Sequence, residues 1–145
     1  MIYAGTFHRT MDAKKRVTVP SDWLGSDGEV LYMLPQRSGR YINVMPADEF
    51  ARQEDEVRAK VSPKAWRTIM REIFSAARKI EPDKQGRIVI PEEFCKAAGL
   101  SADVTFLGVK NSFEIWDAAR RSNAAQEKED ALPAEAQEAL EDMGL

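Results

Sequence analysis

The feature that most constrains the fold of this chain is an internal repeat. Asp12–Pro20 matches Asp83–Pro91 without a gap, at a constant offset of 71 positions. Aspartate, arginine and proline coincide, and a β-branched triplet precedes each proline, Val-Thr-Val in the first copy and Ile-Val-Ile in the second. Trp23 falls on Phe94 at the same offset. Two copies in 145 residues predict a paired fold rather than a solenoid.

Both copies predict the same order of local elements. A strand leads to a turn, a short β-branched strand ends at the proline, and a short helix follows. We expect these helices at 21–24 and 91–98. Pro91 suits a first helical turn and Gly99 suits a left-handed exit, which strengthens the second assignment.

Two further strands follow in each copy. Tyr41–Val44 falls on Phe113–Trp116 at an offset of 72. The Lys110–Asn111 connection predicts a tight hairpin, because asparagine tolerates positive φ. The strands are expected at 29–34, 40–45, 104–109 and 112–116.

Two helices are predicted between the copies. Pro46–Lys60 begins with a proline and acidic residues, as helix N-termini do. Ser62 can cap the next helix, with Pro63 at its first position. Apolar residues then recur at helical spacing at Trp66, Ile69, Met70, Ile73, Phe74 and Ala77. We interpret this stripe as intramolecular core in preference to a surface for a partner helix.

Charge is distributed unevenly along the chain. The net charge is −3, yet residues 122–145 alone carry −6, which leaves about +3 on residues 1–121. Local clusters decide electrostatic attraction more than the total does, so a basic site on the body is compatible with an acidic protein. Residues 117–145 are rich in Ala and Glu and predict a peripheral helix or frayed tail, interrupted at Pro133.

Composition excludes several classes of protein. Cys95 is the only cysteine and His8 the only histidine, so neither an intramolecular disulfide nor a four-ligand zinc site is expected. No apolar run approaches the roughly 18 residues of a membrane helix. The first residues lack the pattern of a secretory signal. We therefore expect a cytoplasmic protein with no metal and no cofactor.

The two repeated turns contain the charged residues that we expect to be functional. Asp83–Gly86 is typical of a hairpin loop built on a type I turn, with Gly86 as its left-handed residue. Asp83 and Arg87 then flank the turn within reach of each other. In the first copy Lys15 replaces the glycine. Either that lysine adopts positive φ at a cost of roughly 1–2 kcal/mol, or the first turn has another shape.

Each turn combines structural and functional candidates. Asp12, Asp83 and Gly86 are interpreted as structural, the two aspartates as turn caps and cross-strand ion partners. Arg16 and Arg87 have two open interpretations, the same ion pair or contact with phosphates and base edges, which a guanidinium fork suits. Two like basic loops related by approximate two-fold symmetry favour DNA. The candidate DNA-binding residues are Lys14, Lys15, Arg16, Lys84 and Arg87.

These motifs resemble the MraZ family of bacterial regulators, which carry two SpoVT-AbrB-type domains in one chain. The resemblance rests on the two Asp-x-x-x-Arg motifs and on Gly108–Trp116, and it covers about residues 1–120. On this resemblance, the motif maps onto Asp12 with Arg16 and Asp83 with Arg87. Its basic, DNA-contacting loops map onto 14–16 and 84–87. Lys15 departs from the family, which usually has glycine there.

The resemblance implies an α+β fold, a swapped-hairpin double-split β-barrel formed by two intertwined AbrB-like halves with flanking helices. It also implies a homo-oligomeric ring that associates with the nucleoid and represses the division and cell-wall gene cluster. The DNA target would be a set of direct repeats in the promoter. The corresponding division is a first repeat at 1–50, connecting helices at 51–76, a second repeat at 77–120 and an acidic helical or frayed tail at 121–145.

Three other functions stay open at this point. An AbrB-type antitoxin-like regulator would bind both DNA and a protein partner, although such proteins usually carry one copy of the motif. An enzyme would use Asp12 and Asp83 as paired carboxylates, but no nucleophile–base pair, Gly-rich phosphate loop or metal-ligand cluster accompanies them. A purely structural ring protein would not need the basic turns at all.

Overall fold

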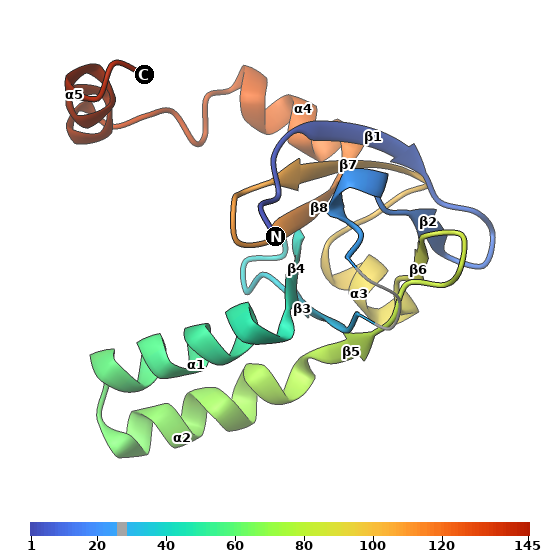
Figure 1. Ribbon diagram of the computed structural model, residues 1–145, viewed down its shortest axis with the longest axis horizontal. Helices are drawn as coiled ribbons and strands as arrows, with labels where there is room; N and C mark the ends of the chain where they lie inside the picture. Colours follow the sequence, from blue (N-terminus) through green and yellow to red (C-terminus); the bar gives the residue numbers. More distant parts are fainter. Residues whose placement is uncertain (26–28) are drawn as a thin grey trace.

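The computed structural model describes residues 1–25 and 29–145, an α+β fold built on antiparallel strands (Figure 1). The strands are β1 (Thr6–Thr10), β2 (Arg16–Thr18), β3 (Leu31–Pro35), β4 (Ile42–Pro46), β5 (Arg78–Ile80), β6 (Arg87–Val89), β7 (Asp103–Gly108) and β8 (Phe113–Asp117). The helices are α1 (Ala47–Lys60), α2 (Pro63–Glu72), α3 (Glu92–Ala97), α4 (Ala118–Gln126) and α5 (Ala134–Asp142), with short 3₁₀ turns η1 (Ser21–Trp23) and η2 (Phe74–Ala76).

The larger sheet interleaves the two copies of the repeat. Its strand order is β1-β7-β8-β4-β3-β5, and every neighbouring pair is antiparallel. The β7–β8 hairpin of the second copy lies between β1 and β4 of the first. The β3–β4 hairpin of the first copy lies between β8 and β5 of the second. Neither copy therefore completes its hydrogen bonding without the other.

The smaller sheet is a ribbon in which the copies pair with each other. Val17 on β2 lies opposite Ile88 on β6, and these two residues occupy equivalent positions of the repeat. The flanking pairs are Arg16 with Val89 and Thr18 with Arg87. Exchanging the copies leaves this pairing unchanged. A local two-fold axis therefore passes between Val17 and Ile88, as the repeat predicted.

The strands do not close into one barrel among the described residues. β1 and β5 are the edges of the six-stranded sheet, and the β2–β6 ribbon forms a separate sheet. With only three residues each, β2 and β6 satisfy their hydrogen bonds on one another. The α+β class is confirmed, while the swapped-hairpin double-split barrel stays a prediction.

Trp23 holds the core together. Its side chain is 2% exposed, and its indole N–H donates to the Ala4 carbonyl at 3.1 Å. Four aromatic rings surround it at centroid distances of 5.0–6.3 Å: Tyr3, Phe7, Phe106 and Phe113. Because these rings come from both copies, burial of Trp23 joins the two halves.

The predicted helices and strands are found with small shifts in their bounds. α3 ends near Gly99, which takes φ 62°, and Ser62 Oγ accepts from the Ala65 N–H at 3.2 Å at the start of α2. In the β7–β8 connection, however, Lys110 takes the positive φ of 80°, so the prediction for Asn111 was wrong. Lys110 exchanges two backbone hydrogen bonds with Tyr3, each at 2.9 Å, so a contact distant in sequence, and not residue preference, fixes this position.

The second match between the copies is shifted by one residue. β4 and β8 share the same burial pattern when aligned at an offset of 71, which places Ile42 on Phe113 and Met45 on Trp116. The offset of 72 matched one aromatic pair, Tyr41 with Phe113. Burial on one face of a strand alternates by residue, so it fixes the alignment more firmly than residue type does.

The apolar stripe of the connecting helices is only half-buried. α2 ends at Glu72, the stripe continues into η2, and no side chain of α2 is buried. Phe74 packs on Phe50 of α1 at 5.5 Å between ring centroids, and Phe50 stacks on Tyr32 at 4.5 Å. The end near the sheet therefore belongs to the core, while the α1–α2 hairpin projects away from the body (Figure 1).

The acidic tail forms two helices separated around Pro133, as its composition predicted. Asp117 caps α4 by accepting from the Arg120 N–H at 3.2 Å. α5 stands apart from the body (Figure 1) and makes no extensive contact with any other helix or strand that the structure describes. None of the described helices is both long and apolar enough to span a lipid bilayer.

Replacement of Trp23 tests its role in joining the copies. Trp23→Ala is expected to lower the free energy of unfolding by about 3–5 kcal/mol, the cost of removing a buried aromatic side chain. Urea unfolding followed by circular dichroism measures this loss. Trp23→Phe should lose less, and Val109→Ala, at a side chain that is 46% exposed, should change stability little. An alanine variant as stable as the wild type contradicts the assignment.

Candidate nucleic-acid interface

The second turn is a closed loop organised by Asp83. Its Oδ1 accepts from the backbone N–H groups of Gln85 and Arg87, each at 2.9 Å. Backbone bonds from Gly86 N–H to the Asp83 carbonyl, and from Asp83 N–H to the Arg87 carbonyl, close the loop at 2.9 Å. Gly86 takes φ 77°. The predicted structural roles of Asp83 and Gly86 agree with this geometry.

The first turn has the same geometry despite Lys15. Asp12 Oδ1 accepts from the N–H groups of Lys14 and Arg16 at 2.9 Å, matching the bonds of Asp83. The Lys15 N–H donates to the Asp12 carbonyl at 3.0 Å, and Lys15 takes φ 62°. Of the two alternatives, a lysine at positive φ is therefore the correct one. The aspartate network, rather than a glycine, holds this turn in shape.

The two turns are joined directly. Val19 N–H donates to the Gly86 carbonyl at 2.9 Å, and Ile90 N–H donates to the Lys15 carbonyl at 3.0 Å. These bonds extend the ribbon at both ends and exchange places under the local two-fold axis. Figure 1 shows the two loops side by side at the edge of the molecule remote from α5. The repeat therefore brings Lys14, Lys15, Arg16, Lys84 and Arg87 onto one end of the fold.

Each arginine is held by its own aspartate through one nitrogen. Arg16 Nε donates to Asp12 Oδ2 at 2.7 Å, and Arg87 Nε donates to Asp83 Oδ2 at 2.9 Å. In the described part of the chain, no acceptor bonds the terminal nitrogens of either guanidinium. The arginine side chains are 33% and 31% exposed. The ion pair and the DNA contact are thus compatible interpretations of these arginines. The ion pair orients each guanidinium through Nε, and the N–H donors of its terminal nitrogens stay available.

Sequence reasoning missed two exposed positions between the arginines. Along the ribbon the side chains alternate, so Val17 and Ile88 face the core. Thr18 and Val89 face solvent, and Val89 is 54% exposed. Together with the two arginines they form the outward face of the ribbon. The sequence contains a signal for these positions. Side chains alternate along a strand, so the middle residue of each β-branched triplet, Thr18 and Val89, must face away from its buried neighbours.

The hydrogen bonds to the two aspartates also lower the pKa values of their carboxyl groups. The Arg16 backbone N–H, assisted by the Arg16 side chain, holds the pKa of Asp12 below its usual value of 3.8. The Arg87 backbone N–H does the same for Asp83. Both carboxylates are therefore ionised at neutral pH and keep the turns closed.

The arrangement does not resemble a catalytic centre. Asp12 and Asp83 are each engaged by their own turn and are exposed, so they do not form a paired-carboxylate pocket. Cys95 is buried, and burial raises the pKa of its thiol. Within residues 1–25 and 29–145, no three His, Cys, Asp or Glu side chains come together to hold a metal ion.

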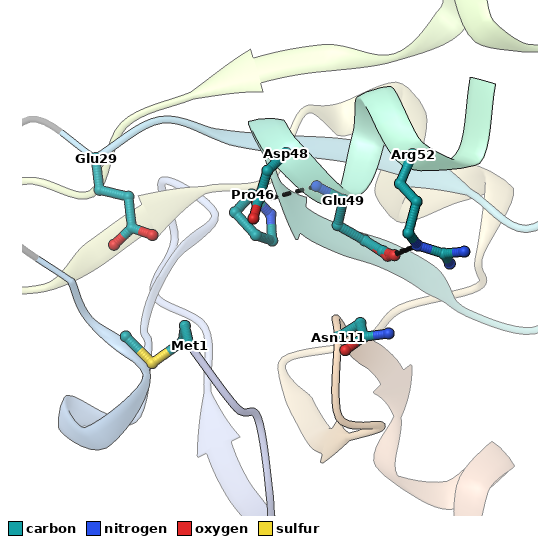
Figure 2. A pocket seen from close by; sticks show the side chains of 7 residues that line it. All are labelled: Met1, Glu29, Pro46, Asp48, Glu49, Arg52 and Asn111. Atoms are coloured by element: carbon teal, nitrogen blue, oxygen red, sulfur yellow. Dashed lines mark hydrogen bonds and ion pairs between the residues drawn. The ribbon is translucent and has the colours of Figure 1, made fainter. Parts of the chain in front are cut away.

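A hollow of about 270 Å³ lies elsewhere, between the start of α1 and the β7–β8 connection. Glu29, Asp48 and Glu49 line it, and Arg52 pairs with Glu49 (Figure 2). Burial, followed by the charges of Glu29 and Asp48, raises the pKa of nearby Tyr3 to about 12. The carboxylates that line the hollow repel phosphate, so the hollow is not part of a nucleic-acid interface.

Exchanging lysine and glycine at the equivalent positions 15 and 86 tests whether the two turns share one backbone geometry. Lys15→Gly is expected to raise the free energy of unfolding by about 1 kcal/mol, because glycine adopts positive φ without steric cost. Gly86→Lys should lower it by about 1–2 kcal/mol for the same reason. Its Cβ would also approach Leu24 Cδ1 at 2.8 Å. Urea unfolding measures both changes, and equal stability of all three proteins contradicts the shared geometry.

The lowered pKa values of the aspartates predict a pH dependence. A carboxyl whose pKa is lower in the folded state stabilises the fold above its unfolded pKa, and this contribution is lost as pH falls through the folded pKa. Asp12→Asn/Asp83→Asn keeps one acceptor oxygen at each position, but it cannot titrate and should remove that part of the acid sensitivity. We expect the Tm difference between wild type and variant to narrow as pH falls below 3.8. A constant difference down to pH well below this value contradicts the assignment.

Comparison with known proteins places these features in a family. The family model described as "MraZ protein, putative antitoxin-like" matches residues 73–143. A Kocuria rhizophila protein named Transcriptional regulator MraZ is 36% identical over 132 residues, covering 90% of this chain and 92% of that protein. A protein of the same name from Desulfitobacterium hafniense is 34% identical, covering 99% and 100%. One from Treponema denticola is 30% identical, covering 97% and 99%. The chain therefore belongs to the MraZ family, a family of transcriptional regulators and not of enzymes.

Proposed function

We propose that this chain is a sequence-specific DNA-binding transcriptional regulator that contacts DNA through the β2–β6 ribbon and its two turns. The observation that carries the proposal is the pair of basic turns bonded to each other across a local two-fold axis. The two turns hold five cations and two aspartates, so this end of the fold is positive although the chain is acidic. The names of the relatives supply the regulatory part.

The β2–β6 ribbon is of a kind that can enter a DNA groove. A two-stranded antiparallel ribbon fits the major groove, where each base pair presents its own pattern of donors and acceptors. Arg16 and Arg87 would present their free guanidinium nitrogens to guanine edges or to phosphates. Thr18 and Val89, between them on the outward face, would lie against base edges, and Val89 is suited to a thymine methyl group. Lys14, Lys15 and Lys84 would bind phosphates and set the register.

The aspartates contribute to binding without touching DNA. Each one fixes an arginine through Nε before DNA arrives, which lowers the conformational entropy lost on binding. Each also fixes the backbone of its turn, so that lysine and arginine leave the loop in defined directions. The local two-fold axis then presents the same constellation twice, once from each copy of the repeat.

Binding to repeated DNA elements follows from how few cations one protomer supplies. The affinity of a single protomer should be modest and strongly salt-dependent. A homo-oligomeric ring would present the same turns several times, and direct repeats in a promoter would engage several protomers at once, which raises affinity without new contacts. We extend the proposal to repression of the division and cell-wall gene cluster from such repeats. The interleaved sheet and ribbon would then correspond to the double-split barrel of this family.

Substitutions in the two turns test the DNA contact. Arg16→Ala and Arg87→Ala are each expected to weaken binding to DNA upstream of the chain's own gene about tenfold or more, since a bidentate base contact contributes about 1–3 kcal/mol. Lys84→Ala should instead reduce the slope of log affinity against log salt by about 0.9, the value for one phosphate contact. Footprinting locates the site, and a salt titration by fluorescence anisotropy measures the affinities.

A matched control separates local contact from overall charge. Arg37→Ala removes one exposed cation from the β3–β4 connection, away from the ribbon. It should leave affinity and salt slope close to wild type. Circular dichroism and assembly mass should be unchanged in all four variants. Wild-type binding by both arginine variants across the salt titration overturns the proposal.

A further inference from the structure

α5 has no extensive packing partner among residues 1–25 and 29–145. It spans nine residues, and all of its side chains except Ala136 and Leu140 are exposed. Isolated helices of this length are marginal in water, so most helical stability must come from packing of an apolar face. α5 and its flanks have such a face, formed at helical spacing by Leu132, Ala136, Leu140 and Met143. Leu132 is 54% exposed and Met143 71% exposed.

The tip of the α1–α2 hairpin carries an apolar groove of about 400 Å³. We call it the hairpin groove; its lining residues are Arg58, Val61, Pro63, Trp66 and Arg67. The Arg58 guanidinium lies 4.2 Å from the centre of the Trp66 ring, which makes one wall both aromatic and cationic. Trp66 Nε1–H finds no acceptor among the described residues. This nitrogen is itself buried, so a partner would pack on the aromatic and apolar surface of the wall rather than bond to it.

The hairpin groove and α5 carry opposite charge. From Val57 to Arg71 the chain has five cations and no acidic residue. Arg58 and Lys60 already pair with Glu54 and Glu56 of α1, which leaves Lys64, Arg67 and Arg71 for a partner. From Ala134 to Leu145 it has four acidic residues and no cation. Glu135 and Asp142 follow one side of the apolar face of α5, and Glu141 follows the other side. A helix that placed its apolar face in the groove would therefore bring carboxylates to the arginines on the rim.

α5 is held away from the groove of its own chain. Asp130 Oδ2 accepts from Arg40 Nη2 at 2.6 Å, and Glu129 Oε2 accepts from Arg120 Nη2 at 3.0 Å. Three residues then separate Asp130 from the start of α5. Figure 1 shows α5 at the upper left and the α1–α2 hairpin at the lower left, well apart from each other. The anchored linker thus presents α5 outward, toward another molecule.

We propose that α5 of one protomer docks into the hairpin groove of a second copy of this chain. The apolar face of α5 packs on Trp66 and Val61, and its flanking carboxylates pair with Arg67, while Arg58 keeps its ion pair with Glu54 of α1. Each copy offers one helix and one groove, so the contact is heterologous and propagates from protomer to protomer until it closes. It uses neither of the basic turns and does not depend on the proposed DNA binding.

Cross-linking between two single-cysteine variants tests the contact in the full chain. Val61→Cys on one copy and Leu140→Cys on a mass-tagged copy are co-expressed and oxidised. We expect a covalent heterodimer in about tenfold greater yield than from Val61→Cys with Glu138→Cys, since Glu138 lies on the opposite face of α5. Cys95 is buried and is present in every variant, so it contributes equally to the background. Heterodimer yield no greater than this control overturns the proposal.

A charge reversal and a double variant exclude the alternatives. Arg67→Glu should lower the heterodimer yield severalfold, and the matched reversal Lys96→Glu on α3 should not. If Val61→Cys/Leu140→Cys in one chain yields only an internally bridged monomer, docking is within the chain and the proposal is wrong. If Arg67→Glu instead weakens DNA binding and leaves cross-linking unchanged, the cations of the hairpin bind phosphates and the proposal is likewise wrong.

Discussion

The pairing of β2 with β6 is the interaction on which the rest of the structure depends. Val17 and Ile88 are equivalent residues of the repeat and lie opposite each other, so the two copies meet along a local two-fold axis. The bonds from Val19 to Gly86 and from Ile90 to Lys15 then fix the two turns relative to each other. The inward residues of the ribbon, Val17 and Ile88, are buried, whereas the outward residues are half-buried or exposed. One short ribbon therefore both joins the halves and presents the candidate DNA-contacting face.

The local structure of each copy could be predicted from the sequence, but the pairing between copies could not. Asp83, Gly86 and Pro91 report on backbone conformation within a few residues, and the turn and helix that they predict are present. Strand pairing depends on contacts far apart in the chain, and local propensity does not record them. The open sheet and separate ribbon are of this kind. So are the positive φ at Lys110 and the offset of 71 for β4 and β8, both set by how the hairpins pack.

The charged residues of the candidate site could be predicted from the sequence by their charge, but its uncharged residues could not. The five cations stand out because two basic turns recur at a fixed spacing. Thr18 and Val89 carry no charge, and only the alternation of buried and exposed residues along the ribbon identifies them. Lys15 shows why glycine alone is an incomplete marker of this turn. The four hydrogen bonds and the ion pair made by Asp12 hold the backbone in a conformation that lysine disfavours, so the aspartate is the more informative residue.

The separation of charge along the chain connects the two proposals. Phosphates attract the basic turns and repel the carboxylates of the tail, so an unanchored tail would compete with DNA for the same cations. The structure limits that competition in two ways. Arg40 and Arg120 engage Asp130 and Glu129, which neutralises the linker and fixes its direction. Docking of α5 against the cations of a neighbouring hairpin would remove four further acidic residues from the field that DNA encounters. The acidic composition of the chain is then compatible with binding to an acidic polymer, because opposite charges are satisfied between protomers at a distance from the ribbon.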